Sequence, residues 1–150
     1  MTNVYAPEPI PAQEVKELLN TYWDVTTTGK IPNPTYVVVT GASQEIRHDL
    51  TKGDLLVVRA GNWREEIIGN YTYGNRYYEV FLEVFTLNQR QRLYDIMQEV
   101  KRVVHSKKHS MDNYQRIAFT DFEDKTDDTF NVWEGRISLE LQNAGVLLET

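Results

Sequence analysis

Apolar and polar residues alternate along positions 77–86, whose sequence is YYEVFLEVFT. Successive side chains of a strand point to opposite faces, so this period of two predicts a β-strand. One face of the strand is wholly apolar and predicts packing on a core; it consists of Tyr78, Val80, Leu82 and Val84. The other face interleaves aromatic rings with acids; it consists of Tyr77, Glu79, Phe81, Glu83 and Phe85.

This second face differs from an ordinary solvated surface, on which polar residues predominate. Two explanations of what covers this second face stay open. The rings pack beneath helices of the same chain, or they form a subunit interface, since interfaces favour Tyr, Trp, Phe and Arg. At an interface, the carboxylates would pair with arginines of a neighbouring subunit. The candidate interface residues are Tyr71, Tyr73, Arg76, Tyr77, Glu79, Phe81, Glu83 and Phe85.

Several other stretches have strand character. β-Branched residues predict strands over 35–40 (TYVVVT) and 54–60 (DLLVVRA), and alternation predicts two closing strands over 114–122 and 132–141. In the last of these, Arg136, Ser138 and Glu140 are expected to face away from the core. The segments on either side of Gly74-Asn75 read as a long antiparallel hairpin, because this pair suits the positive backbone angles of a tight turn.

Apolar residues spaced three and four positions apart predict two helices. The shorter helix runs from Ala12 to Trp23. The longer helix follows Thr86, which has the T-x-x-Q spacing of a capping box with Gln89. Its apolar stripe consists of Leu93, Ile96, Met97, Val100, Val103 and Val104.

Together these elements predict an α+β fold, an antiparallel β-sheet with a long helix packed on one face and a short N-terminal helix. At 150 residues the chain has the usual length of a single domain. Three of the five prolines lie within residues 1–11, which favours an extended N-terminal arm. Residues 143–150 are expected to form a C-terminal tail.

Composition narrows the functional classes. No apolar run is long enough to span a bilayer, and the N-terminus lacks the pattern of a signal peptide, so we expect a cytoplasmic protein without membrane contact. The absence of cysteine excludes disulfides, thiol nucleophiles and thiolate metal sites. With 16 basic and 22 acidic residues, the net charge of -6 disfavours a broad phosphate-binding surface.

Candidate catalytic and metal-binding residues are few. His105 and His109 have helical spacing, but neighbouring lysines would repel a cation. Asp54 with Glu65 and Glu66 offers a metal-dependent nuclease site if these acids converge. No phosphate-binding loop, nucleophile elbow or set of acid, base and nucleophile is present in the sequence. We therefore expect neither catalysis nor a cofactor, and keep the nuclease as an alternative.

The order of elements resembles that of the small neck proteins of tailed bacteriophages. The strand YYEVFLEVFT leads into the helix LNQRQRLYDIMQEVKRVVH, and YQRIAFTDF and VWEGRISLEL follow. Within that group the chain looks most like the tail terminator, or tail-completion protein. The likeness covers roughly residues 12–142 and lies in length, element order and hydrophobic pattern, without a diagnostic motif.

The resemblance implies a structural protein without catalytic residues. Tail terminators form a ring, usually a hexamer, that caps the finished tail tube and presents a surface to the head-side connector. The implied partners are further copies of the chain, the tail tube protein and a connector or neck protein, with DNA passing through the lumen without specific binding. The alternative from the residues alone is a binding module that recognises a partner through its aromatic hairpin and forms no ring.

Overall fold

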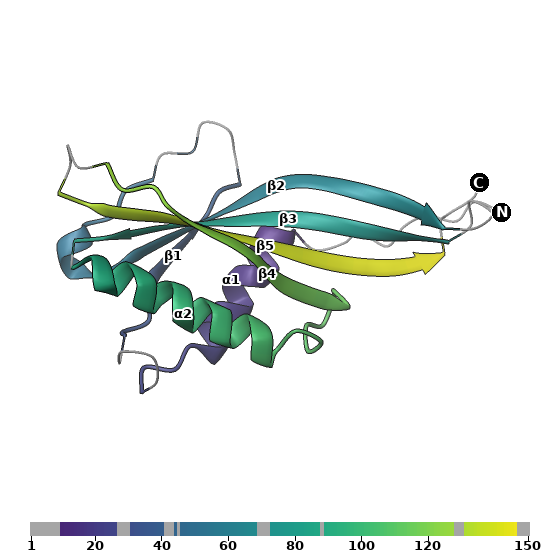
Figure 1. The fold of residues 1–150 in the computed structure, drawn as a ribbon, viewed down its shortest axis with the longest axis horizontal. Coiled ribbons are helices and arrows are strands. Elements are labelled where there is room, and N and C mark those ends of the chain that lie inside the picture. Colours follow the sequence, from purple (N-terminus) through teal and green to yellow (C-terminus); the bar gives the residue numbers. More distant parts are fainter. Residues whose placement is uncertain are drawn as a thin grey trace.

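Five strands form one sheet in the order β1-β2-β3-β5-β4 in a computed structural model of the chain (Figure 1). The structure describes residues 10–26, 31–40, 44, 46–68, 73–87, 89–127 and 131–146. The strands are β1 Thr35–Val38, β2 Leu55–Ile68, β3 Tyr73–Thr86, β4 Arg116–Asp124 and β5 Trp133–Val146. The helices are α1 Pro11–Tyr22 and α2 Arg90–Ser106, with a short 3₁₀ turn, η2, at Leu50–Lys52.

The fold is α+β with a mixed sheet, which corrects the prediction of a purely antiparallel one. β1 runs parallel to β2, whereas the pairs β2–β3, β3–β5 and β4–β5 are antiparallel. Parallel neighbours need a crossover of about a dozen residues or more, and residues 39–54 provide that length. The sequence pattern predicted the two strands but not their relative direction.

The hairpin between β2 and β3 is long, as predicted, but its turn lies elsewhere. Gly74-Asn75 belongs to β3, where Gly74 pairs with Ile67 on one side and Gly145 on the other. The strands are joined through residues 69–72, which lie outside the described residues. This segment contains a second Gly-Asn pair, Gly69-Asn70, so composition alone could not choose between the two positions.

The start of α2 also differs from the prediction. Its N-cap is Gln89 without a side-chain cap, and Thr86 does not form the capping box. Thr86 is instead fully buried at the end of β3, where its hydroxyl donates to Asp54 Oδ1 at 2.6 Å. Arg92 of α2 donates to Asp54 Oδ2 at 3.2 Å, so this buried carboxylate joins β2, β3 and α2.

Both helices pack on one face of the sheet and form the core with it (Figure 1). The apolar stripe predicted for α2 is buried there, except that Met97 is only partly buried. The buried residues of α1 are Ala12, Val15, Leu18 and Leu19, and Tyr22 near its end is 41% exposed. The buried residues of β3 and β5 come from alternate positions, as the period of two predicted, whereas in β2 the consecutive residues Leu55–Val58 are all buried. Some of the buried sheet residues form the core with the helices. They are Leu56, Val58, Val80, Leu82, Val84, Ile117, Ile137, Leu139 and Leu141.

A buried carboxylate also links the two helices. Glu99 of α2 is 1% exposed and accepts hydrogen bonds from the guanidinium of Arg102. It accepts a further bond of 2.8 Å from the backbone N–H of Asp24, just beyond α1. Arg102 in turn donates to the Tyr22 carbonyl at 2.9 Å, so the C-terminal end of α1 is fixed against α2 by charge-assisted bonds.

The sheet continues well beyond the helices as a ribbon of three strands (Figure 1). We call residues 63–68, 73–78 and 141–146 of β2, β3 and β5 the projecting ribbon. Residues 143–146 therefore belong to a strand, which corrects the prediction of a tail from 143; residues 147–150 lie outside the described part. Of the predicted N-terminal arm, residues 1–9 also lie outside it, and Pro11 already belongs to α1.

Candidate subunit interface

The face of the sheet opposite the helices carries the rings and acids that the alternation predicted. Along β3 the core positions are fully buried at Val80, Leu82 and Val84. The residues between them are half-buried. We call this side the open face; on β3 it consists of Tyr77, Glu79, Phe81, Glu83 and Phe85.

Neighbouring strands place opposite charges beside these residues. Glu83 lies opposite Arg136 of β5, and Phe81 lies opposite Arg59 of β2. Directly opposite residues point to the same side of the sheet, so both arginines belong to the open face. Glu79, in contrast, lies opposite Glu140 of β5, which places two acids side by side.

Two acids of the open face find arginine partners within the chain. Arg59 Nε donates to Glu83 Oε1, and Arg64 lies 3.8 Å from Glu140. Glu83 therefore has an arginine partner within its own chain, and its pairing with an arginine of a neighbouring subunit stays a prediction. The Arg59 and Glu83 side chains are 42% and 25% exposed, and pairs this accessible contribute about 0–1 kcal/mol to stability. They can exchange partners at little cost.

Guanidinium groups also cover the rings. The Arg136 guanidinium lies 4.0 Å from the centre of the Phe81 ring, and that of Arg64 lies 4.0 Å from the centre of the Tyr77 ring. Such cation–π contacts are worth about 0.5–1 kcal/mol at exposed sites. The rings are thus covered in part by flexible cations of the same chain, and by neither helix.

A bulge in β2 brings backbone against the centre of the open face. The β2–β3 register shifts between Ala60 and Trp63. A Cβ built on Gly61 would lie 2.6 Å from Phe81 Cε2 and 2.7 Å from Glu79 Oε1. Only glycine admits this approach without displacing the ring or the carboxylate.

One end of the open face is hollowed. A cavity of about 300 Å³ is lined by Leu50, Phe85, Asp127, Val132 and Glu134. Burial raises the pKa of the Glu134 carboxyl, and the charges of Glu83 and Asp127 raise it further against the opposing charge of Lys125. Negative charge therefore accumulates around Phe85.

Three of the predicted interface residues cannot be assigned to the open face: one lies on the helix side, and the side chains of the other two lie outside the described part. Arg76 alternates with Tyr77 and so lies on the helix side of the sheet. The backbone of Tyr73 belongs to β3, but its side chain lies outside the described part, as does the whole of Tyr71. Tyr78, on the core side, packs edge-on against Tyr114 with ring centres 5.5 Å apart.

Sequence reasoning missed Arg59 as a member of this surface. Arg136 was expected to face away from the core, but its position over Phe81 depends on the β3–β5 register. A period of two assigns a residue to a face and says nothing of its neighbours across strands. The run DLLVVRA gave no signal for Arg59, because its apolar residues are consecutive and Leu55–Val58 are all buried.

The acids of the nuclease alternative do not converge. Asp54 immediately precedes β2, and Glu66 lies near its far end, roughly 30–40 Å away by the ordinary rise of a strand. His109 lies beyond Ser106, the last residue of α2, so it does not share a helix face with His105. Within the described residues, no three acids or histidines are grouped as metal ligands.

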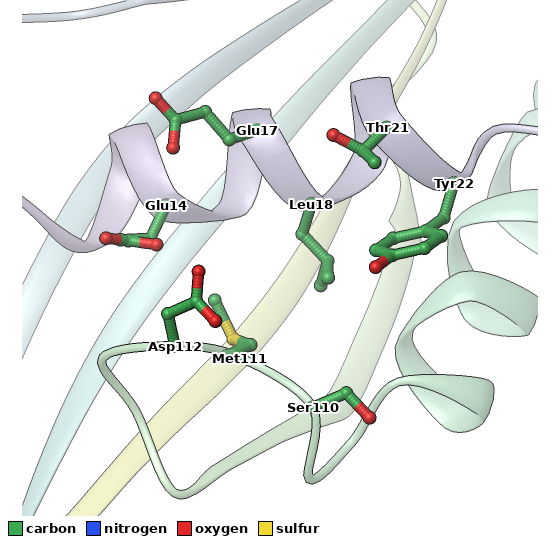
Figure 2. Close-up of a pocket in the computed structure, with 8 residues that line it drawn as sticks. All are labelled: Glu14, Glu17, Leu18, Thr21, Tyr22, Ser110, Met111 and Asp112. Atoms are coloured by element: carbon green, nitrogen blue, oxygen red, sulfur yellow. The ribbon is translucent and has the colours of Figure 1, made fainter.

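An acidic pocket lies on the other side of the molecule, between α1 and the segment after α2 (Figure 2). Its volume is about 210 Å³, and it is lined by Glu14, Glu17, Leu18, Thr21, Tyr22, Ser110, Met111 and Asp112. Asn113 donates to Glu14 at 2.6 Å, and Lys107 lies 4.4 Å from the centre of the Tyr22 ring. Its carboxylates disfavour a phosphate ligand.

Neither described helix has the length and apolar character needed to cross a bilayer. Comparison with models of known protein families gave no match, and comparison with curated proteins gave none.

Proposed function

We propose that the protein is a structural virion protein, a ring-forming tail terminator that caps the tail tube and joins it to the head-side connector. The observation that carries the proposal is the open face, where rings and charges of both signs lie on the side of the sheet without helices. The resemblance in element order to phage neck proteins supplies the class of assembly.

The chemistry of the open face suits a subunit contact. Phe81 and Tyr77 are half-buried beneath arginines that can move away from them. Aromatic and arginine side chains are enriched where proteins associate, and their burial there exceeds that in the isolated chain. Because the intrachain pairs are weak, Glu83 and Arg59 can re-pair across an interface.

A closed ring fits a molecule with two unlike sides. Head-to-tail contacts require each subunit to present two different surfaces. Here one side of the sheet offers rings and charges, whereas the other carries α1 and α2. The net charge of -6 suits a channel through which DNA slides, since a basic lining would retain phosphates. In this proposal the protein is assembled in the host cytoplasm and resides in the neck of the virion.

The first test is the solution mass of the purified protein, measured by light scattering over a concentration series with and without preformed tail tubes. Negative-stain images of large species accompany it. We expect rings of about six subunits, formed in solution or on the tube. Monomers under both conditions would reject the ring and favour the binding module, for which the exposed projecting ribbon is the supporting observation.

A double variant tests the surface itself. Phe81→Ala with Glu83→Arg should abolish ring formation while the circular dichroism spectrum stays that of the folded protein, because both residues lie on the half-buried side of β3. Unfolding of this variant would show that the open face is structural, and unchanged assembly would exclude it as the contact.

A further inference from the structure

The edges of the sheet are not equally accessible, and that of β5 is sealed at the projecting ribbon. The Gln115 side chain donates from Nε2 to the Ala144 carbonyl at 3.0 Å, and its Oε1 accepts from the Ala144 N–H at 2.9 Å. One carboxamide thereby satisfies both backbone groups that a further strand would use. Asn143 adds to the seal, because its side chain bonds the Gln115 N–H and the Asn113 carbonyl.

The outer edge of β4 is also interrupted. The Ile117 N–H donates to the Lys108 carbonyl at 3.0 Å, which occupies one position of the edge. The β4–β5 register then shifts between Phe119 and Asp121. Bulges and covering loops are among the devices by which proteins prevent strand addition at an edge.

The edge of β2 in the projecting ribbon has no such protection within the described residues. β1 accompanies β2 only over Leu55–Val58, and beyond it β2 pairs with β3 alone. Trp63 is 64% exposed and Ile67 is 50% exposed. Figure 1 shows β2 as the outermost strand of the ribbon, clear of both helices. The backbone of residues 63–67 is therefore a template for another strand.

We propose that this edge pairs with the same edge of a second copy of the chain, antiparallel and centred on Glu65. In this register Trp63 lies opposite Ile67 of the second copy, and Arg64 lies opposite Glu66 of the second copy. Each pair occurs twice because the contact has two-fold symmetry. Apolar side chains thus meet apolar ones, and opposite charges meet, which stabilises directly opposed positions.

Alternative registers lack this complementarity. The smallest shift of register that keeps every side chain on its own face moves the centre of pairing from Glu65 to a neighbouring residue. Arg64 then lies opposite Arg64, or Glu66 opposite Glu66, of the second copy. In the first case Trp63 also meets Glu65, and in the second Ile67 does. Charged residues on an edge ordinarily discourage pairing. Here the self-paired register turns Arg64 and Glu66 into partners, and only Glu65 meets its own copy.

This inference goes beyond the proposed function and does not depend on it. A two-fold contact joins subunits in pairs, whereas a ring closes through head-to-tail contacts. The surfaces also differ, since the ring contact is assigned to the open face of β3 and the pair to the edge of β2. Dimers would accordingly persist in the Phe81→Ala, Glu83→Arg variant.

Sedimentation velocity over a concentration series tests the pairing through a charge exchange. Arg64→Glu alone and Glu66→Arg alone each create two like-charge pairs and should weaken dimerisation roughly tenfold. In the heterodimer formed by an equimolar mixture of the two variants, both pairs between positions 64 and 66 again join opposite charges. We expect the mixture to dimerise more tightly than either variant alone, which loss of the intrachain contact of Arg64 with Glu140 would not produce.

Glu65→Gln supplies a second readout in the opposite direction. It removes the repulsion between the two copies of Glu65 at the two-fold axis and should strengthen the dimer severalfold. If Glu65 only kept the edge soluble and did not lie on that axis, the affinity of the dimer would stay unchanged. A wild-type protein that stays monomeric at the highest soluble concentration would overturn the proposal. So would a mixture of Arg64→Glu and Glu66→Arg that behaves as the sum of its components, with folding of each variant verified by circular dichroism.

Discussion

Arg136 shows how a single side chain gives the open face its mixed character. It lies opposite Glu83 across the β3–β5 pair, and its guanidinium stacks 4.0 Å from the centre of the Phe81 ring. A guanidinium can cover an aromatic surface while its charge stays in water. The face therefore tolerates solvent in the isolated chain and still offers rings to a partner.

At the same scale, the raised pKa of Glu134 predicts that removing its charge stabilises the protein, and that this gain depends on pH. Burial, with Glu83 and Asp127 nearby, raises its pKa above the ordinary value of 4.5, so its ionised form is disfavoured in the folded state. Wild type loses stability from this group as pH rises through the raised pKa. Glu134→Gln should therefore increase the free energy of unfolding at pH 7, and the gain should vanish below about pH 4.5.

Urea unfolding at pH 7 and pH 4 measures this difference. Glu123→Gln is the control, because Glu123 is also an acid near the same end of the sheet but is largely exposed. A Glu134→Gln variant equal to wild type at pH 7, or one that gains stability equally at both values, would contradict the assignment.

Among the elements, Gly135 shows how closely α2 approaches the sheet. A Cβ at this buried glycine would lie 2.9 Å from Phe122 Cε2 and 3.0 Å from Leu93 Cδ1. Gly135→Ala should cost about 1–3 kcal/mol through overpacking. Chemical denaturation measures the loss, with Ser138→Ala on the open face of the same strand as the control. Unchanged stability would mean that α2 shifts away without penalty.

The helices and strands were predictable wherever a regular hydrophobic pattern continues over many residues. Alternation located β3, β4 and β5, and helical spacing located α1 and α2 to within a few residues. The direction of β1, the position of the hairpin turn and the N-cap of α2 were not predictable, because each depends on contacts distant in sequence. Thr86 is the clearest case: its spacing to Gln89 fits a cap, but the buried carboxylate of Asp54 takes its hydroxyl.

The sequence predicted which residues of β3 share the open face, but not which residues of the neighbouring strands cover them. Alternation selected five residues of β3 that share one side. The arginines that cover them belong to β2 and β5, and only the strand register brings Arg59 and Arg136 to Phe81 and Glu83. Side-chain pairs across strands are set by register, which the sequence of one strand does not encode.

For the whole molecule, the separation of ribbon and core predicts unequal local stability. Val80, Leu82 and Val84 are fully buried beneath the helices, whereas Asn75 and Arg76 belong to the ribbon beyond them. Amides of residues 75–76 should exchange with deuterium at least about tenfold faster than those of 80–84. Native-state hydrogen exchange of the unassembled protein measures this. Equal protection would mean that ribbon and core open together.

Because Gln115 caps the edge of β5, the projecting ribbon can add another strand at the edge of β2 alone. A ribbon with two open edges can add copies on both sides without limit, which is the geometry of a growing fibre. The carboxamide on Ala144 closes one side, so among the described strands of the ribbon a strand added at β2 leaves no second edge on which addition can continue. A side chain of this kind separates a protein that pairs and stops from one that polymerises, and Gln115→Ala is the change that would remove the distinction.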